Sequence, residues 1–146
     1  MSDLRELYQE TILDHYSKPR NAGRLEDANH TAEGYNPLCG DQVKLYLKVE
    51  DGVIVDARFE GTGCAIATAS ASMMTESIKG RRTTEAMQLL DNMHGMVTSG
   101  AKVGDVGKLE VLAGVHEFPQ RVKCATLAWH TMKAALENLE EPVTTE

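Results

Sequence analysis

The 146-residue chain carries 22 acidic against 15 basic residues, a net charge of −7, and so offers no basic stripe to neutralise nucleic-acid phosphates. With 42% hydrophobic and 25% charged residues it has the composition of a water-soluble globular protein. No apolar run approaches the length of about 18 residues that a transmembrane helix needs. These values argue against a nucleic-acid binder and a membrane protein, and favour a protein partner.

The length predicts one domain over residues 1–146, large enough to bury a core without disulfides. The first residues, Met1–Glu6, lack the basic start and apolar block of a secretion signal, so a cytoplasmic and reducing location is expected. Three cysteines are an odd number, which argues against a closed disulfide framework. Metal binding, catalysis and plain burial remain as their possible roles.

The N-terminal segment has apolar residues at helical spacing and ends at the breaker-rich stretch 18–23, which predicts an amphipathic helix. Its apolar positions are Leu4, Leu7, Tyr8, Ile12 and Tyr16. The helix either covers the core or docks onto a partner. A weaker pattern over residues 30–35 suggests a short strand.

A β-hairpin is the firmest local prediction. Residues 43–49 alternate apolar and polar side chains, Asp51-Gly52 is a two-residue turn signal, and residues 53–59 form the second strand. Cys39 precedes the first strand and Cys64 follows the second. Because an antiparallel turn brings the outer strand ends together, the two thiols should be neighbours.

The second half of the chain is predicted to be helical. A helix rich in small residues follows Cys64 and ends at Lys79-Gly80, and a third helix is predicted with Thr83 as its N-cap. The core face of the third helix comprises Ala86, Leu89, Leu90, Met93 and Val97. A short helix with Gly114 as its cap precedes a last helix over about 124–139. The acidic tail, residues 140–146, is expected to fray.

Three cysteines and one aspartate stand in unusual settings. In the stretch 36–41, Cys39 and Asp41 flank Gly40, so a backbone bend can aim sulfur and oxygen at one point. Cys64 follows a second glycine-containing corner, and Cys124 follows the cations Arg121 and Lys123. Three thiolates and one carboxylate are the four anionic ligands that a tetrahedral zinc or an iron–sulfur site takes.

Binding requires thiolates, and a free cysteine with a pKa of about 8.5 is mostly protonated at neutral pH. Cys64 and Cys124 are both expected at or next to helix N-termini, which favour an anion. The ligand set around a divalent zinc would carry a net charge near −2, which Arg121 and Lys123 could balance. A carboxylate should be easier to displace than a fourth cysteine, which indicates a site that can open.

Structural explanations exist for each of these residues taken singly. A buried cysteine is often a small hydrophobe, and Asp41 could be a turn or cap residue. The five histidines show no paired metal-binding spacing and are expected on the surface or hydrogen-bonded in the core. The methionines are expected to fill the core.

Four motifs resemble the U-type iron–sulfur cluster assembly proteins, the IscU and NifU N-terminal family, and most closely its SufU-type branch. They are Tyr16–Gly23, Asn36–Asp41, Gly61–Ile66 and Phe118–Trp129, in order over nearly the whole chain. Lys123 stands where IscU scaffolds have a histidine, the Leu-Pro-Pro-Val-Lys stretch that a chaperone reads is missing, and an extra helical segment separates Cys64 from Cys124. These departures are typical of the SufU-type branch.

The resemblance implies an α+β fold with a small three-stranded antiparallel sheet packed on about five helices (SufE/IscU-like). It implies a zinc ion held by Cys39, Asp41, Cys64 and Cys124. It also implies a partner cysteine desulfurase of the SufS-like kind. In that family the thiol matching Cys39 leaves the zinc to take persulfide sulfur, and a histidine of the partner replaces it on the metal.

Three functional hypotheses remain. The first is a zinc-dependent, sulfurtransferase-like relay that accepts persulfide sulfur and passes it to downstream iron–sulfur assembly proteins. The second is an iron-binding scaffold on which a transient [2Fe-2S] cluster is assembled. The third is a structural zinc module or interaction domain. Lys123 favours the relay, because an ammonium is a poor metal ligand but a good neighbour for an anionic site.

Overall fold

A computed structural model describes residues 2–101, 104–138 and 142–144, with side chains from residue 9 onward. The described elements are, in order, α1 (Ser2–Ser17), β1 (His30–Asn36), β2 (Asp41–Glu50), β3 (Val53–Thr62), α2 (Ala65–Ile78), α3 (Thr83–Ser99), the 3₁₀ helix η1 (Gly107–Glu117), α4 (Pro119–Leu136) and β4 (Val143–Thr144). This α+β arrangement, with five helices among the described residues, confirms the predicted fold class.

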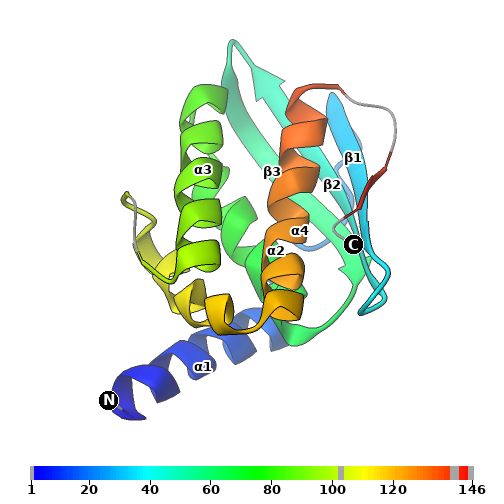
Figure 1. Cartoon of the computed structure of the whole chain (residues 1–146). Helices are drawn as coiled ribbons and strands as arrows, with labels where there is room; N and C mark the ends of the chain where they lie inside the picture. Colours follow the sequence, from blue (N-terminus) through cyan, green and yellow to red (C-terminus); the bar gives the residue numbers. More distant parts are fainter. Residues whose placement is uncertain (1, 102–103, 139–141, 145–146) are drawn as a thin grey trace.

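The sheet has four strands in the described residues, in the order β3-β2-β1-β4 (Figure 1). Strands β1, β2 and β3 are antiparallel, as predicted. The predicted number of three strands is wrong, because Val143 and Thr144 pair in parallel with Gly34 and Tyr35 of β1. The described part of the acidic tail is therefore paired rather than frayed; residues 139–141 and 145–146 lie outside the described residues.

The β2–β3 hairpin confirms the prediction from Asp51-Gly52. Both turn residues have positive φ, 52° and 76°, as a two-residue turn that matches the strand twist requires. The strands extend beyond the predicted ranges, so that Gln42 at the start of β2 faces Thr62 at the end of β3. Asp41 and Cys64 consequently lie at the same end of the sheet.

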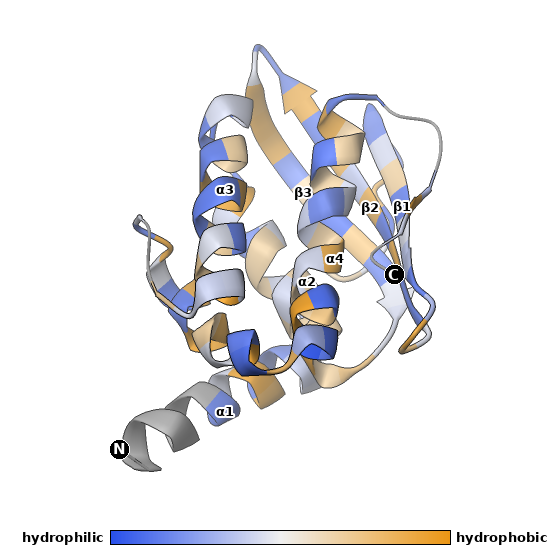
Figure 2. Ribbon diagram, in the orientation of Figure 1, coloured by the Kyte–Doolittle hydropathy of each residue, from blue (hydrophilic) through white to orange (hydrophobic). Residues whose placement is uncertain are grey.

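Helices α2 and α4 pack on one face of the sheet, and α3 and η1 pack outside them (Figure 1). Gly34 permits the close approach of β1 to α4, because a Cβ there would overlap Thr131 Oγ1. The interior is filled by Leu45, Leu47, Ile54, Met73, Met74, Met93, Met96, Leu109, Leu112 and Trp129, which are almost wholly inaccessible to solvent. Figure 2 shows the alternation of hydrophobic and hydrophilic residues along β3. The core role expected for most methionines is confirmed.

Helix boundaries differ from the predictions at three places. The N-cap of α3 is Arg82, whose N–H donates to Glu85 Oε1 at 3.0 Å, and Thr83 is the first helical residue. η1 continues through Gly114 to Glu117. α4 begins at Pro119, five residues before the predicted start, because proline is well suited to the first helical turn.

Helix α1 packs on α2 through a different residue from the one its apolar spacing suggested. His15 is 1% exposed, whereas Tyr16 is 45% exposed. Ile12 is half-buried against the core; the side chains of Leu4, Leu7 and Tyr8 lie outside the described residues.

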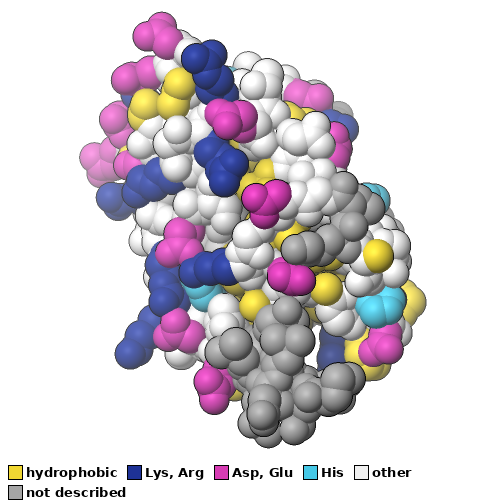
Figure 3. Space-filling view, turned by 90° about the vertical axis from the view of Figure 1, so that its left-hand side faces the viewer, with side chains coloured by type: hydrophobic (Ala, Val, Ile, Leu, Met, Phe, Trp, Pro, Cys, Tyr) yellow, Lys and Arg dark blue, Asp and Glu magenta, His cyan; other side chains and the backbone are white. Residues whose placement is uncertain are grey.

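In the described part of the chain, no helix has the length and apolar content that crossing a bilayer demands. On the face shown in Figure 3, acidic and basic side chains are intermixed and hydrophobic ones are scattered.

Candidate metal centre

The β1–β2 loop, the end of β3 and the start of α4 lie at the lower end of the sheet in Figure 1. Cys39 lies in the four-residue loop between β1 and β2, and Asp41 is the first residue of β2. Cys64 follows β3 and immediately precedes α2, while Cys124 lies in the second turn of α4. The hairpin therefore brings Cys39 and Cys64 to one end of the sheet, as predicted, and α4 adds Cys124.

The ligand atoms of Cys39, Asp41 and Cys124 all lie within 4.8 Å of one another. The sulfurs of Cys39 and Cys124 are 3.5 Å apart. Cys64 is not part of this mutual group, but its sulfur lies 3.9 Å from Asp41 Oδ2. Around one tetrahedral zinc, ligand atoms at bond lengths of about 2.0–2.3 Å stand roughly 3.5–3.8 Å apart. The donor set and its spacing thus fit a thiolate-binding metal.

Asp41 is oriented by the backbone of the next strand. Its Oδ1 accepts a hydrogen bond of 2.9 Å from the N–H of Cys64, which leaves Oδ2 directed at the thiols. Gly63 makes this approach possible, because a Cβ at residue 63 would lie 2.8 Å from Asp41 Oδ1. This glycine is needed for space and not for an unusual φ.

The loop that carries Cys39 has the bend predicted for it. The N–H of Cys39 donates to the carbonyl of Asn36 at 3.2 Å, closing a turn, and Gly40 adopts the left-handed φ of 71°. Cys39 is exposed, Cys64 is half-buried, and Cys124 and Asp41 are buried. Cys39 is consequently the most accessible thiol of the three.

The expected position at a helix N-terminus is confirmed for Cys64. Cys64 is the N-cap of α2, and its sulfur accepts a hydrogen bond of 3.4 Å from the N–H of Ala67. The sulfur of Cys64 thus caps the first turn of α2.

The same expectation is wrong for Cys124, which lies inside α4 rather than at its start. Burial, together with hydrogen bonding to Asp41, Cys39 and Cys64, raises the pKa of Cys124 far above its ordinary value. A bare Cys124 is therefore a neutral thiol, and a cation would have to displace its proton to bind.

The two cations predicted to balance the site have other neighbours in the structure. The guanidinium of Arg121 lies 4.3 Å from the ring centroid of Phe118. Lys123 lines an open groove together with His94, His130 and Lys133. Their influence on the thiols stays a prediction.

Sequence reasoning missed Asn36, which lies beside the ligands. Asn36 is wholly buried, and its Nδ2 is 3.4 Å from Asp41 Oδ2 and 3.5 Å from Cys124 Sγ. No spacing pattern could have indicated this, because the contact with Cys124 joins residues 88 positions apart. Its position at the end of β1, before a proline, was the only local signal.

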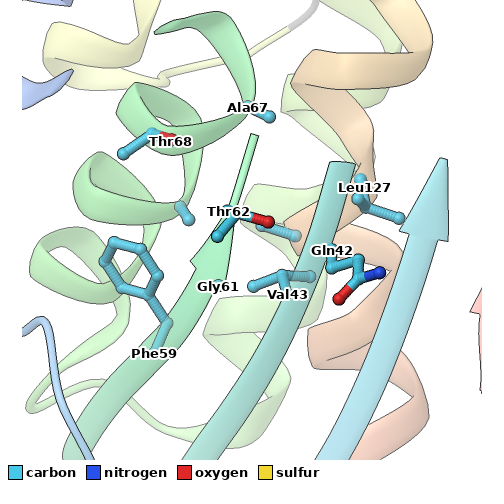
Figure 4. Close-up of a pocket in the computed structure, with 10 residues that line it drawn as sticks. Gln42, Val43, Phe59, Gly61, Thr62, Ala67, Thr68 and Leu127 are labelled. Atoms are coloured by element: carbon cyan, nitrogen blue, oxygen red, sulfur yellow. The ribbon is translucent and has the colours of Figure 1, made fainter. Parts of the chain in front are cut away.

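A small cavity lies behind the site, between the ends of β2 and β3 and helices α2 and α4 (Figure 4). Its volume is about 20 Å³, and its walls are largely apolar, with Val43, Phe59 and Leu127 among the lining residues. Such a space holds a single water at most. Chemistry on an organic substrate in this cavity is excluded, which directs attention to the exposed thiol.

The histidines have partners away from the thiols, as expected. His15 contacts Ser72 at 2.7 Å, and His30 and His116 contact backbone carbonyls. His94 and His130 contact each other with ring centroids 5.6 Å apart.

Fold and site together define a class of protein: an α+β domain that holds three cysteines and an aspartate at one end of its sheet. Residues 7–145 match the family described as NifU-like N terminal domain, and the chain belongs to this family. The predicted membership of the IscU/NifU N-terminal family is thereby confirmed.

Relatives of both functional kinds are similar over nearly the whole chain. An iron-sulfur cluster assembly scaffold protein IscU of Thermotoga maritima is 45% identical, over 93% of this chain and 96% of its own. A zinc-dependent sulfurtransferase SufU of Bacillus subtilis is 41% identical over 95% of each chain. A crystal structure titled as a SUF-system scaffold protein from Fervidobacterium islandicum AW-1 superposes with a TM-score of 0.82 at 39% identity, covering 90% of this chain and 98% of its own.

Proposed function

We propose that this protein is a zinc-dependent sulfur acceptor that relays persulfide sulfur from a cysteine desulfurase into iron–sulfur cluster assembly. The observation that carries the proposal is the exposure of Cys39 beside a buried donor set: its sulfur is 3.5 Å from that of the buried Cys124. The similarity to the Bacillus subtilis zinc-dependent sulfurtransferase supports the choice of zinc.

Cys39, Asp41, Cys64 and Cys124 would hold the zinc ion. Soft thiolates and a harder carboxylate both suit the borderline-soft Zn²⁺ ion, and their arrangement around one end of the sheet supports a single site. Bound zinc keeps coordinating thiols in the reactive thiolate form at neutral pH.

Accessibility supports Cys39 as the sulfur-accepting thiol. A partner's persulfide can approach this exposed thiol, whereas Cys124 is 3% exposed. The Cys39 thiolate attacks the outer sulfur of the partner's persulfide, an S–S bond forms at Cys39, and the partner's S–S bond breaks to release its thiolate. No net oxidation occurs, since the sulfane sulfur moves between two thiols.

The partner that fits this chemistry is a cysteine desulfurase of the SufS-like kind, which carries a cysteine-derived persulfide. The downstream acceptors would be other iron–sulfur assembly proteins. A surface reaction between two proteins also agrees with the small cavity behind the site, which has no room for a free substrate.

An assembly scaffold is the second candidate, because the same four ligands could hold a transient [2Fe-2S] cluster. The 45% identity to a protein named as a scaffold favours it. Lys123, next to Cys124, weighs against it, because this position offers an ammonium and not a further metal ligand.

One paired experiment separates the candidates. The relay predicts that protein as isolated contains one firmly held zinc by elemental analysis and accelerates desulfurase turnover. Anaerobic reconstitution that yields a stable, transferable cluster would support the scaffold instead. A structural zinc module predicts that Cys39→Ala lowers fold stability and leaves sulfur transfer untouched.

A further inference from the structure

Asn36 occupies the point where the loop, the sheet and α4 meet. It is the last residue of β1 and the cross-strand partner of Asp41. Its backbone carbonyl accepts the N–H of Cys39 at 3.2 Å. Through backbone contacts alone, Asn36 therefore fixes two of the four proposed ligands relative to each other.

The side chain of Asn36 contacts two of the proposed ligands. Its Nδ2 lies 3.4 Å from Asp41 Oδ2 and 3.5 Å from Cys124 Sγ. The first distance is longer than the usual N–H···O range of about 2.7–3.2 Å, while the second is ordinary for the larger sulfur atom. The two N–H groups of one amide can thus serve both ligands at once.

The oxygen of the Asn36 amide bears on the orientation of this side chain. Asn36 Oδ1 is buried and has no hydrogen-bond partner among the described residues. It is the one buried side-chain nitrogen or oxygen in this part of the chain that lacks a partner. Reversing the amide would turn this oxygen towards a carboxylate and a sulfur, which repel it once they are ionised. An orphaned buried acceptor is costly, so the donor end must gain enough at the site to hold this orientation.

We propose that Asn36 is a positioning residue of the metal centre. Its amide donates to Asp41 Oδ2 and Cys124 Sγ and directs both atoms at one point, while it binds no metal itself. Because Cys124 lies inside α4 and away from the helix N-terminus, this amide supplies the donor that the N–H of Ala67 supplies to Cys64. The inference rests on the proposed metal centre and is independent of the sulfur relay.

The test compares two isosteric substitutions in the full chain. Asn36→Asp keeps the shape of the side chain but replaces the donor N–H groups with an oxygen. This oxygen would repel both Asp41 Oδ2 and Cys124 Sγ. Asn29→Asp is the matched control, because the Asn29 amide bridges the N–H and carbonyl of Val49 at 2.8 Å each, away from the site. Zinc affinity is measured by competition with a chromophoric chelator. We expect Asn36→Asp to weaken zinc binding by about 10- to 100-fold, in the range known for outer-shell partners of metal ligands, and Asn29→Asp to leave it unchanged.

A second variant keeps the test decisive if Asn36→Asp fails to fold. Asn36→Ala removes the donor without adding charge, and the Co²⁺-substituted protein reports on the thiolates directly. Loss of an N–H···S hydrogen bond raises the energy of the sulfur lone pairs, so the sulfur-to-cobalt charge-transfer band should move to longer wavelength.

Asn36 variants with the parent's zinc affinity and an unmoved cobalt band would overturn the inference and leave the proposed function standing. A parent protein that binds no zinc would overturn both. A band shift together with weakened zinc binding, in a variant whose metal-free form unfolds like the parent's, supports the positioning role over a merely structural one.

Discussion

Gly63 shows how a residue without a functional side chain can determine the geometry of the site. The absence of a Cβ at residue 63 lets Asp41 reach the N–H of Cys64, and this contact leaves one carboxylate oxygen free for the thiols. The sequence indicated a flexible backbone corner at Gly63, whereas in the structure residue 63 must lack a Cβ to leave room for Asp41.

Gly63→Ala should therefore displace Asp41. Because a charge-assisted hydrogen bond is lost, we expect destabilisation by about 1–3 kcal/mol together with weaker zinc binding. Denaturant unfolding and chelator competition measure the two effects. Gly114→Ala is the control, since a Cβ there meets no atom within 4 Å; equal behaviour of the two variants would refute the steric role of Gly63.

At this scale the sequence predicted the proximity of the proposed ligands better than their environments. Cys39, Asp41 and Cys64 could be placed together because they flank or lie within recognisable turns. The roles of Asn36 and Gly63 depend on contacts across strands and with α4, which no local pattern records. The acid strength of Cys124 was predicted wrongly because the start of α4 was placed five residues too late.

Helix α1 is attached to the body of the molecule through a buried histidine. His15 contacts Ser72 of α2 at 2.7 Å, and the hydroxyl of Ser72 also accepts the N–H of Arg20 at 2.9 Å. Burial lowers the pKa of His15, the positive charges of Lys108 and Arg20 add to this effect, and Glu76 and Asp14 oppose it.

The lowered pKa of His15 predicts a pH-dependent stability. In the unfolded chain His15 binds a proton with its ordinary pKa of about 6.5, which is above its pKa in the folded protein. The contribution of neutral His15 to the stability of the fold is therefore fully present above a pH of about 6.5. It is lost as the pH falls below about 6.5 towards the folded pKa. His130, whose pKa burial also lowers, acts in the same direction.

Denaturant unfolding between pH 5 and 7.5 measures this dependence for the parent, His15→Gln and His130→Gln. We expect the parent to lose stability as the solution is acidified. Each substitution should reduce the slope of the unfolding free energy against pH by the contribution of the histidine that it removes. A slope that is unchanged in His15→Gln would show that α1 is held without a neutral histidine.

Among the elements, the prediction succeeded for the hairpin turn and for the core face of a long helix, and it failed for the helix caps at Thr83 and Gly114. The Asp51-Gly52 turn determined the hairpin, and the core face of α3 was identified from its spacing: Ala86, Leu89, Leu90, Met93 and Val97 are all buried. Strand β4 was missed because two residues carry no periodic pattern, and its pairing depends on β1, far earlier in the chain.

At the scale of the whole molecule, the proposed ligands connect three parts of the chain that are distant in sequence: the β1–β2 loop, the start of α2 and the second turn of α4. A metal ion bound there would link the sheet to both helices that pack on it. Zinc binding should therefore be coupled to global stability.

Removal of zinc with a chelator should lower the free energy of unfolding. At free zinc 100 times the dissociation constant, mass action gives about 2.7 kcal/mol of stabilisation, which calorimetry would detect as a higher Tm for the loaded protein. Adding Zn²⁺ back should restore the Tm, and Mg²⁺ should not, because it prefers oxygen ligands. Identical unfolding of the loaded and stripped protein would contradict a shared site.

The transfer of sulfur to one particular thiol is the central claim, and mass spectrometry tests it most directly. Zinc-loaded protein is incubated with a cysteine desulfurase and cysteine, the thiols are blocked, and the peptides that contain Cys39, Cys64 and Cys124 are mapped. The account predicts a single added sulfur on Cys39, absent in Cys39→Ser. Added sulfur on Cys64 or Cys124, or none on any of the three while the desulfurase turns over, would contradict it.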